Sequence, residues 1–150
     1  MKLSRLNQEM RAFFADLYEG ESKPLVLGEG SENARLALVG EAPGEQEALK
    51  GKPFVGKAGR NLDEFLRATG LERSQLYITN VVKIRPTRVS EAVRIVNRPP
   101  TREEIALFLP WLKRELEAVK APVVVTLGNV ALQAFVHDTI GQAHGTWRRA

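Results

Sequence analysis

The sequence predicts an α/β protein, a three-layer α/β/α sandwich in which helices cover both faces of a central parallel sheet. Three observations lead to this fold class. Short, nearly continuous apolar runs occur at 35–40, 76–82 and 122–127, as in strands that are buried on both faces. Stretches with helical spacing of apolar residues separate these runs. Turn residues follow each run, and the length of 150 residues predicts one domain spanning 1–150.

Boundary signals place the elements along the chain. Ser4 is a candidate N-cap for the first helix, and Gly20 and Gly70 are placed to end helices. Thr101 and Glu104 have the spacing of a capping box at the start of a later helix. The predicted elements are a helix at 4–18, an extended stretch at 24–30, a strand at 35–40, a helix at 58–69, strands at 76–82 and 122–127, and helices at 101–120 and 128–136.

Two segments are less regular. Proline lacks the amide hydrogen that an α-helix needs, so we expect a break at Pro110. Residues 83–100 are predicted to form a loop, with a short helix at 90–96 as an option. The apolar side chains expected to face the core from the first two helices are Leu6, Met10, Phe13, Phe14, Leu17, Leu62, Phe65 and Leu66.

Composition limits the possible functions. Hydrophobic residues make up 43% of the chain and charged residues 27%, as in a globular domain. No apolar run approaches the roughly 18 residues of a membrane span. The absence of cysteine excludes disulfides and cysteine-bound zinc or iron–sulfur sites, and we expect a cytoplasmic monomer. A net charge of +4 is compatible with a nucleic-acid partner but does not demonstrate one.

Ligands of parallel α/β sheets bind at the carboxyl ends of the strands, where the loops after Gly40, Asn80 and Gly128 should meet. The loop at 40–59 is rich in glycine, which permits close backbone approach to a ligand, although an ordinary strand-to-helix connection explains it equally well. Phe54 in this loop is either a platform for a stacked base or a core residue.

Polar residues at the same edge suggest how a ligand is recognised. The side-chain amide of Asn80 can donate one hydrogen bond to a base edge and accept another from it. A structural role for Asn80 in an Asx turn or a helix cap is as plausible as this role in recognition. The cluster of Glu41, Glu45 and Glu47 lacks the spacing of a metal site, so we predict no metal and favour a single carboxylate that orients water. The two histidines, His137 and His144, have no nearby serine or cysteine that suggests a nucleophilic triad.

Five segments of the chain stand out by their order and spacing. They are Gly-Glu-Ala-Pro-Gly at 40–44, Gly-Lys-Pro-Phe-Val-Gly-Lys-Ala-Gly at 51–59, Tyr-Ile-Thr-Asn-Val-Val-Lys at 77–83, Asn-Arg-Pro-Pro at 97–100 and Val-Val-Val-Thr-Leu-Gly at 123–128. Together they resemble the uracil-DNA glycosylase superfamily, in particular its family 4, over about residues 25–145. The longest motif, at 51–59, is the most specific, and the others support it. The resemblance implies a central four-stranded parallel sheet, whose last strand is expected beyond residue 150.

The resemblance implies a role for each matching residue. Phe54 would stack on a flipped uracil, Asn80 would read its edge, and Glu41 would lie beside the reacting sugar as the catalytic residue. Glu47 would crowd C5 of the base and so disfavour thymine. Ala42 and Gly44 would complete the uracil site, and Lys57, Gly59 and Gly128 would lie near DNA phosphates.

Two departures from family 4 stand out. The cysteines that hold an iron–sulfur cluster in that family align approximately with Phe13, Asp16, Ile84 and Phe108, so we expect packing instead of a cluster and no cofactor. The family's later His-Pro-Ser-like motif is missing from the 150 residues. Residues 145–149 look like the approach to another strand, and we therefore expect the chain to be truncated at its C-terminus.

The resemblance implies hydrolysis of the N-glycosidic bond of uracil in DNA, as in base excision repair. Two alternatives use the same loops without that reaction. One is a non-catalytic module that binds nucleotides or uracil-containing DNA, and the other is an enzyme that acts on free nucleotides. Because the His-Pro-Ser-like motif is missing from the 150 residues, we expect this chain to bind uracil but to cleave the glycosidic bond poorly.

Overall fold

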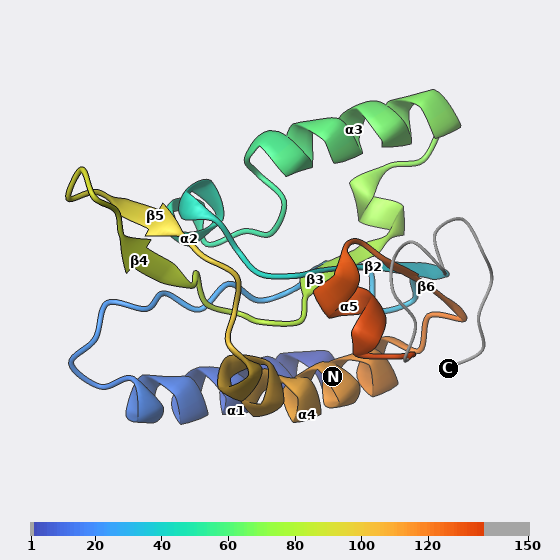
Figure 1. Ribbon diagram of the computed structural model, residues 1–150. Helices are drawn as coiled ribbons and strands as arrows, with labels where there is room; N and C mark the ends of the chain where they lie inside the picture. The colour runs from blue at the N-terminus through green and yellow to red at the C-terminus, as the bar shows by residue number, and fades with distance from the viewer. Residues whose placement is uncertain (1, 137–150) are drawn as a thin grey trace.

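The computed structural model describes residues 2–136. A four-stranded sheet with the order β1-β3-β2-β6 forms the middle layer, and a separate hairpin of β4 and β5 projects from it (Figure 1). The elements are α1 (Lys2–Leu17), β1 (Glu29–Gly30), β2 (Leu36–Gly40), α2 (Glu45–Lys50), α3 (Lys57–Thr69), η1 (Arg73–Gln75), β3 (Tyr77–Asn80), β4 (Thr87–Val89), β5 (Ile95–Asn97), α4 (Arg102–Val119), β6 (Val123–Thr126) and α5 (Asn129–Gln133).

The three strands predicted from apolar runs form the parallel part of the sheet. β2 lies at its centre, with Gly40 beside Asn80 of β3 and Val39 beside Thr126 of β6. β1 adds a strand that was not predicted, and it pairs with β3 in the antiparallel direction, so the described sheet is mixed rather than wholly parallel. This strand is only two residues long and forms an edge, where an antiparallel partner needs no helical crossover. The last parallel strand expected from the resemblance lies outside the described residues.

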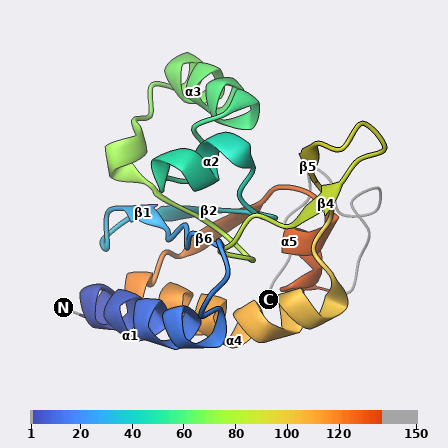
Figure 2. The same cartoon turned by 90° about the vertical axis from the view of Figure 1, so that its left-hand side faces the viewer.

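Helices cover both faces of the sheet, which confirms the three-layer architecture (Figure 2). α1 and α4 lie together on one face, and α3 with the short α2 lies on the other. Alternate strand residues serve the two layers, as expected for a period of two. Val39 packs with the α1 and α4 side chains, whereas Leu38 and Ile78 pack with Leu62 and Leu66 of α3.

The helix boundaries largely follow the predicted signals. Thr101 and Glu104 form the predicted capping box, and Gly70 ends α3 with a φ of 76°. Ser4 is not an N-cap, because α1 already begins at Lys2. α5 ends at Gln133 rather than at 136.

Two predictions about helix interiors are wrong. α4 continues through Pro110, with Phe108 and Leu112 buried on either side of it. Proline has no amide hydrogen, so Pro110 cannot donate to the carbonyl of Ala106. Both residues are exposed, and this carbonyl can therefore be hydrated. Phe65 is 62% exposed, because the buried stripe of α3 follows Gly59, Leu62 and Leu66 and leaves Phe65 about 100° from Leu66 around the axis.

The segment after β3 also differs from the prediction. Residues 90–96 are not helical, since β4 and β5 pair here as a hairpin with Val89 opposite Ile95. β-branched residues suit strands better than helices and explain the outcome. Of the inward residues predicted for α1, Leu6, Met10 and Phe14 are buried, whereas Phe13 and Leu17 are 43% and 48% exposed.

None of the helices within residues 2–136 has the length and apolar character needed to cross a membrane. His137, His144 and the expected strand approach at 145–149 lie outside the described residues.

Candidate functional site

Gly40 and Asn80 mark the carboxyl ends of the two central parallel strands, where they are direct neighbours in the sheet. Their strands stay joined beyond this point, because the Val81 amide donates to the Gly40 carbonyl at 2.9 Å and the Val82 amide to the Glu41 carbonyl at 3.0 Å. The sheet therefore brings the 40–59 loop and Asn80 together, as the sequence predicts.

Phe54 completes this group from the α3 side. A Cβ placed on Gly40 would lie 2.6 Å from Cζ of Phe54 and 2.5 Å from Oδ1 of Asn80. Real side chains do not approach so closely, so glycine at 40 is what allows the ring and the amide to meet. Phe54 also packs with Leu38 and Leu62, so its ring is both a core residue and part of the site.

Asn80 is 4% exposed. Its backbone carbonyl accepts a hydrogen bond from Lys83. Its side-chain Oδ1 lies against Gly40 beside the Phe54 ring, at the strand edge where ligands of parallel α/β sheets bind.

The backbone of Phe54 is held in the left-handed region, with a φ of 54°. This conformation is uncommon for a non-glycine residue and needs support from its surroundings. Nη2 of Arg73 donates to the Phe54 carbonyl at 2.5 Å and to the Gly59 carbonyl at 3.2 Å, while its Nε donates to Asp63 at 2.7 Å. A Cβ on Gly59 would collide with the Phe54 carbonyl, so the start of α3 also presses against this residue.

Glu47 holds the same loop from the other side. Its carboxylate accepts the Gly44 amide at 2.9 Å, the Val55 amide at 2.9 Å and the Gly56 amide at 2.6 Å. These bonds join the start of α2 to the chain just after Phe54, and charge-assisted bonds of this kind are among the stronger ones in proteins. Both carboxylate oxygens of Glu47 thus accept hydrogen bonds from backbone amides, and these bonds fix the conformation of the loop.

Glu41 and Ala42 follow Gly40 directly and are half-buried. Within the described residues the Glu41 carboxylate forms no hydrogen bond or ion pair, which leaves it available at the edge of the site. Two helices begin nearby. Gly56 is the N-cap of α3, so Lys57 and Gly59 lie in its first turn, and Gly128 with a φ of 89° is the N-cap of α5.

A buried polar network supports Asn80 from the opposite face of the sheet. The Lys83 ammonium donates to the Asn80 carbonyl at 2.5 Å, to Thr79 Oγ1 at 2.7 Å and to Glu115 Oε1 at 2.6 Å. The hydroxyls of Tyr77 and Thr79 donate to Glu115 Oε2 at 2.5 and 2.9 Å.

Burial lowers the pKa of Lys83, although the Glu115 carboxylate acts against this. Burial and Glu115 together raise the pKa of the Tyr77 hydroxyl. Gly28 lies against the network, since a Cβ there would be 2.5 Å from Glu115 Oε2. Every donor of the ammonium has a partner, which is the condition under which a buried ion pair is tolerated.

Sequence reasoning missed Arg73, Lys83 and Glu115. The signal for Lys83 was present, because it is a charged residue inside an apolar run. Glu115 lies on the buried stripe of α4 with Phe108, Leu112 and Val119, where a carboxylate without a partner would be costly. Arg73 had no comparable signal, since its contacts join segments that only the fold brings together.

The four positions that align with cluster-binding cysteines do not suit an iron–sulfur cluster. Ile84 and Phe108 are buried in the main core, where Phe108 stacks on Phe14 with ring centroids 4.4 Å apart. Phe13 and Asp16 are exposed, and none of the four side chains supplies a thiolate. Across residues 2–136 no group of three or more histidine, cysteine or acidic side chains is arranged to hold a metal ion.

A surface hollow lined by Lys2, Glu32, Arg35 and Lys120 lies at the opposite edge of the sheet, near the start of β2. It contains none of the predicted site residues. We therefore place the candidate site at the carboxyl ends of β2 and β3.

Comparison with known proteins decides which family this arrangement represents. Residues 27–149 match the model of the uracil DNA glycosylase superfamily. The chain belongs to this superfamily. Its relatives show that it is a family-4-like member, in agreement with the resemblance seen in the sequence.

Two type-4 uracil-DNA glycosylases illustrate the similarity. That of Archaeoglobus fulgidus is 48% identical over 108 residues, which cover 72% of this chain and 50% of the relative. That of Thermotoga maritima is 45% identical over 112 residues, covering 75% and 54%. A type-5 uracil-DNA glycosylase of Pyrobaculum aerophilum is 36% identical over 120 residues, covering 70% and 49%. The chain thus spans about half the length of these superfamily members.

Proposed function

We propose that the protein is a DNA-repair glycosylase that hydrolyses the N-glycosidic bond of uracil in DNA. The observation that carries the proposal is the meeting of Phe54 and Asn80 over Gly40 at the end of the parallel strands. Superfamily membership and similarity to type-4 and type-5 uracil-DNA glycosylases support the choice of base and reaction.

Recognition begins with extrusion of the nucleotide, because the bond to the base cannot be reached inside a stacked duplex. The Phe54 ring stacks on the extruded base. The Asn80 amide donates to O4 of uracil and accepts from N3–H, a pattern that cytosine reverses. Glu47 keeps the loop close to C5 of the base, where a thymine methyl group would need space. Ala42 and Gly44 form the rest of the wall.

Bond cleavage creates positive charge on the sugar and negative charge on the uracil. Glu41, whose carboxylate has no partner among the described residues, orients water or stabilises the sugar cation. The Asn80 amide and backbone amides of the 40–44 loop stabilise the anion. Phosphates bind near Lys57 and Gly59 at the start of α3, and near Gly128, because helix N-termini attract anions.

No iron–sulfur cluster enters this proposal. The buried packing of Ile84 and Phe108 takes the place of the cluster in holding α4 against the core. A cytoplasmic location, a monomeric state and a metal-free site remain predictions.

The test uses the 150-residue chain and a version extended at its C-terminus, each incubated with an oligonucleotide that contains one uracil. Formation of abasic sites supports the glycosylase function, and cleavage by the extended form alone assigns part of the catalysis to the extension. Uracil-DNA binding without cleavage by either form favours the non-catalytic module. Action on free deoxyuridine nucleotides but not on DNA favours the nucleotide enzyme.

A matched pair of variants tests the base-reading role. Asn80→Asp keeps an acceptor and loses the amide donor, so affinity for uracil-DNA should fall about 10- to 100-fold, the usual value of a bidentate contact. Asn33→Ala removes an exposed amide at the opposite edge of the sheet and should leave affinity unchanged. Equal affinity of Asn80→Asp and wild type would refute the assignment of Asn80.

A further inference from the structure

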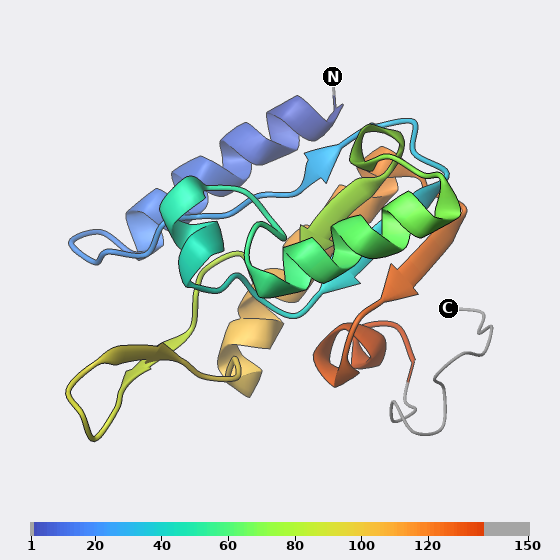
Figure 3. The same cartoon turned by 90° about the horizontal axis from the view of Figure 1, so that it is seen from above.

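The β4–β5 hairpin is the one strand pair among the described residues that does not join the main sheet. Figure 3 shows it extending away from the three layers. Its strands pair with Thr87 opposite Asn97, Arg88 opposite Val96 and Val89 opposite Ile95. The turn is closed by the Ser90 amide, which donates to the Arg94 carbonyl at 2.8 Å.

The root of the hairpin is attached to the candidate site. Asn97 lies next to the site loop, since a Cβ on Gly44 would be 3.3 Å from its Nδ2. Its Oδ1 accepts from Arg85 Nε at 2.6 Å, and Nη2 of Arg85 lies 3.9 Å from the Glu45 carboxylate. The hairpin therefore starts from the rim of the site.

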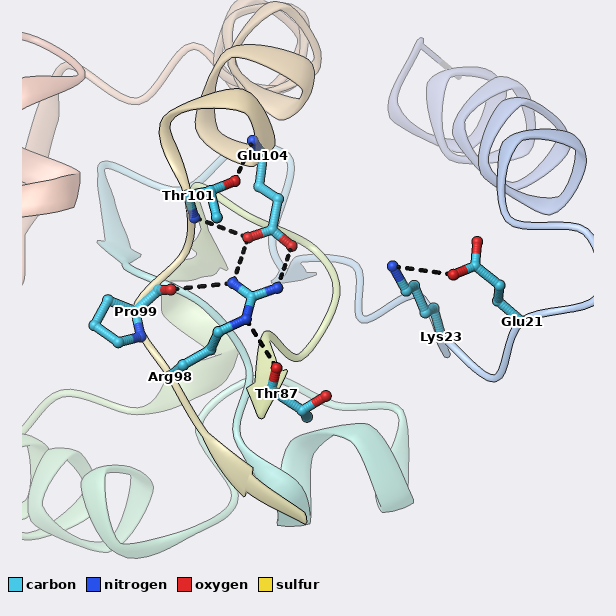
Figure 4. A network of polar contacts seen from close by, with 7 residues as sticks. All are labelled: Glu21, Lys23, Thr87, Arg98, Pro99, Thr101 and Glu104. Atoms are coloured by element: carbon cyan, nitrogen blue, oxygen red, sulfur yellow. Dashed lines mark hydrogen bonds and ion pairs between the residues drawn. The ribbon is translucent and has the colours of Figure 1, made fainter. Parts of the chain in front are cut away.

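A second set of contacts fixes the root to α4 (Figure 4). Nε of Arg98 donates to the Thr87 carbonyl at 2.8 Å, and its guanidinium binds both oxygens of Glu104 at 2.6 and 3.0 Å. This bidentate pair joins the hairpin to the capping box of α4 and restricts its direction. The root is thus held from two sides while the tip has no comparable support.

The two faces of the hairpin differ in character. Val89 and Ile95 are 66% and 64% exposed and share a face with Asn97, which points to Gly44. Arg88 lies on the opposite face, and Arg94 follows at the turn, both exposed. Val93 at the tip is 83% exposed with a φ of 57°. An isolated hairpin with so much exposed aliphatic surface is marginal by itself and suits a surface that binds a partner.

We propose that this hairpin, from Thr87 to Asn97, is a DNA-binding element that docks on the duplex beside the extruded nucleotide. The inference rests on the proposed function and adds a contact surface to it. The face of Val89 and Ile95 continues from the site rim and packs against the bases left unstacked by extrusion. Arg88 and Arg94 bind backbone phosphates, a role that their positive charge and exposure allow.

The experiment measures binding of fluorescently labelled uracil-containing duplex and single strand to the 150-residue chain over a range of salt concentrations. Arg88→Gln/Arg94→Gln should weaken duplex binding about ten-fold or more. It should also reduce the slope of the logarithm of the binding constant against the logarithm of the salt concentration by about two, since each lost phosphate contact lowers this slope by roughly one. The control Arg5→Gln/Arg11→Gln removes the same charge from the exposed side of α1 and should leave the slope unchanged.

A second variant pair addresses the apolar face. Val89→Thr/Ile95→Thr keeps β-branched side chains, so the strands are retained while apolar surface is lost. This variant should bind the uracil duplex several-fold more weakly, bind the uracil single strand like wild type, and bind free uracil unchanged in an NMR titration. Loss of free-uracil binding would instead place the effect in the site.

The outcomes separate the two proposals. If wild type shows no preference for uracil-DNA, the proposed function falls and the hairpin role falls with it. If wild type prefers uracil-DNA while both hairpin variants bind like the Arg5→Gln/Arg11→Gln control, only the hairpin role is overturned. A lower melting temperature with unchanged DNA binding also overturns it, because the face then packs on another part of the protein.

Discussion

The Lys83 ammonium lies 2.6 Å from the Glu115 carboxylate, and both side chains are fully buried. The same ammonium donates to the backbone carbonyl of Asn80, so the ion pair between the segment after β3 and α4 is joined directly to the residue that we assign to base reading. Removal of one charged partner leaves the other buried and unpaired, which costs more than removal of both.

Lys83→Met is therefore expected to lower the free energy of unfolding by about 3–5 kcal/mol. The double variant Lys83→Met/Glu115→Gln should recover part of this loss, because its buried acceptor no longer carries a charge. Urea unfolding of the single and double variants measures the coupling. A double variant as unstable as the sum of its single variants would show that the two charges do not act together.

Substitution of Gly40 should affect the site more than the fold. Gly40→Ala forces the Phe54 ring and the Asn80 amide apart, so uracil affinity should fall at least about ten-fold with a stability loss of roughly 1–3 kcal/mol. Gly70→Ala is a suitable control, because strain at its φ of 76° costs about 1 kcal/mol far from the site. Uracil binding by NMR and thermal unfolding separate the two effects, and similar affinities for both variants would contradict the prediction.

Arg73 is predicted to position Phe54 without touching the base. Lysine lacks the planar fork of arginine, so Arg73→Lys should lose the contacts to the carbonyls of Phe54 and Gly59 and weaken uracil binding several-fold. Asp63→Asn removes only the ion pair with Arg73 and should have a small effect. The intrinsic affinity for free uracil is the measurement, and equal values for wild type and Arg73→Lys would exclude a positioning role.

The Arg98–Glu104 pair predicts a specific dependence of stability on pH. Hydrogen bonds from Arg98 lower the pKa of Glu104 from 4.5 to about 2. A depressed pKa means that the stabilisation is complete above pH 4.5 and is lost as pH falls toward 2. Glu104→Gln should thus be less stable than wild type by roughly 2 kcal/mol at neutral pH, with the difference disappearing near pH 2.

Urea unfolding between pH 2.5 and 7 tests this prediction. Glu103→Gln is the matched control, since Glu103 is exposed in the same helical turn and has no ion pair among the described residues. A constant difference between Glu104→Gln and wild type over this range would show that the Arg98 contact does not set the titration.

Local patterns were enough to predict the three layers, the parallel strands and the meeting of the 40–59 loop with Asn80. Apolar runs and helical spacing are properties of neighbouring residues, and the geometry of a parallel sheet then brings the strand ends together. The same patterns failed at Pro110 and Phe65, where packing on both sides of the proline and the exact stripe of α3 decided the outcome.

The sequence by itself determined the superfamily and the fold class, and it predicted the side chains of the candidate site. Only the tertiary structure decided how these side chains are held. The contacts of Arg73 with Phe54, of Lys83 with Glu115, and of Asn97 with Gly44 join segments that are 19, 32 and 53 positions apart. Contacts at such separations depend on how the layers pack, because no local pattern encodes which distant side chain fills a given space.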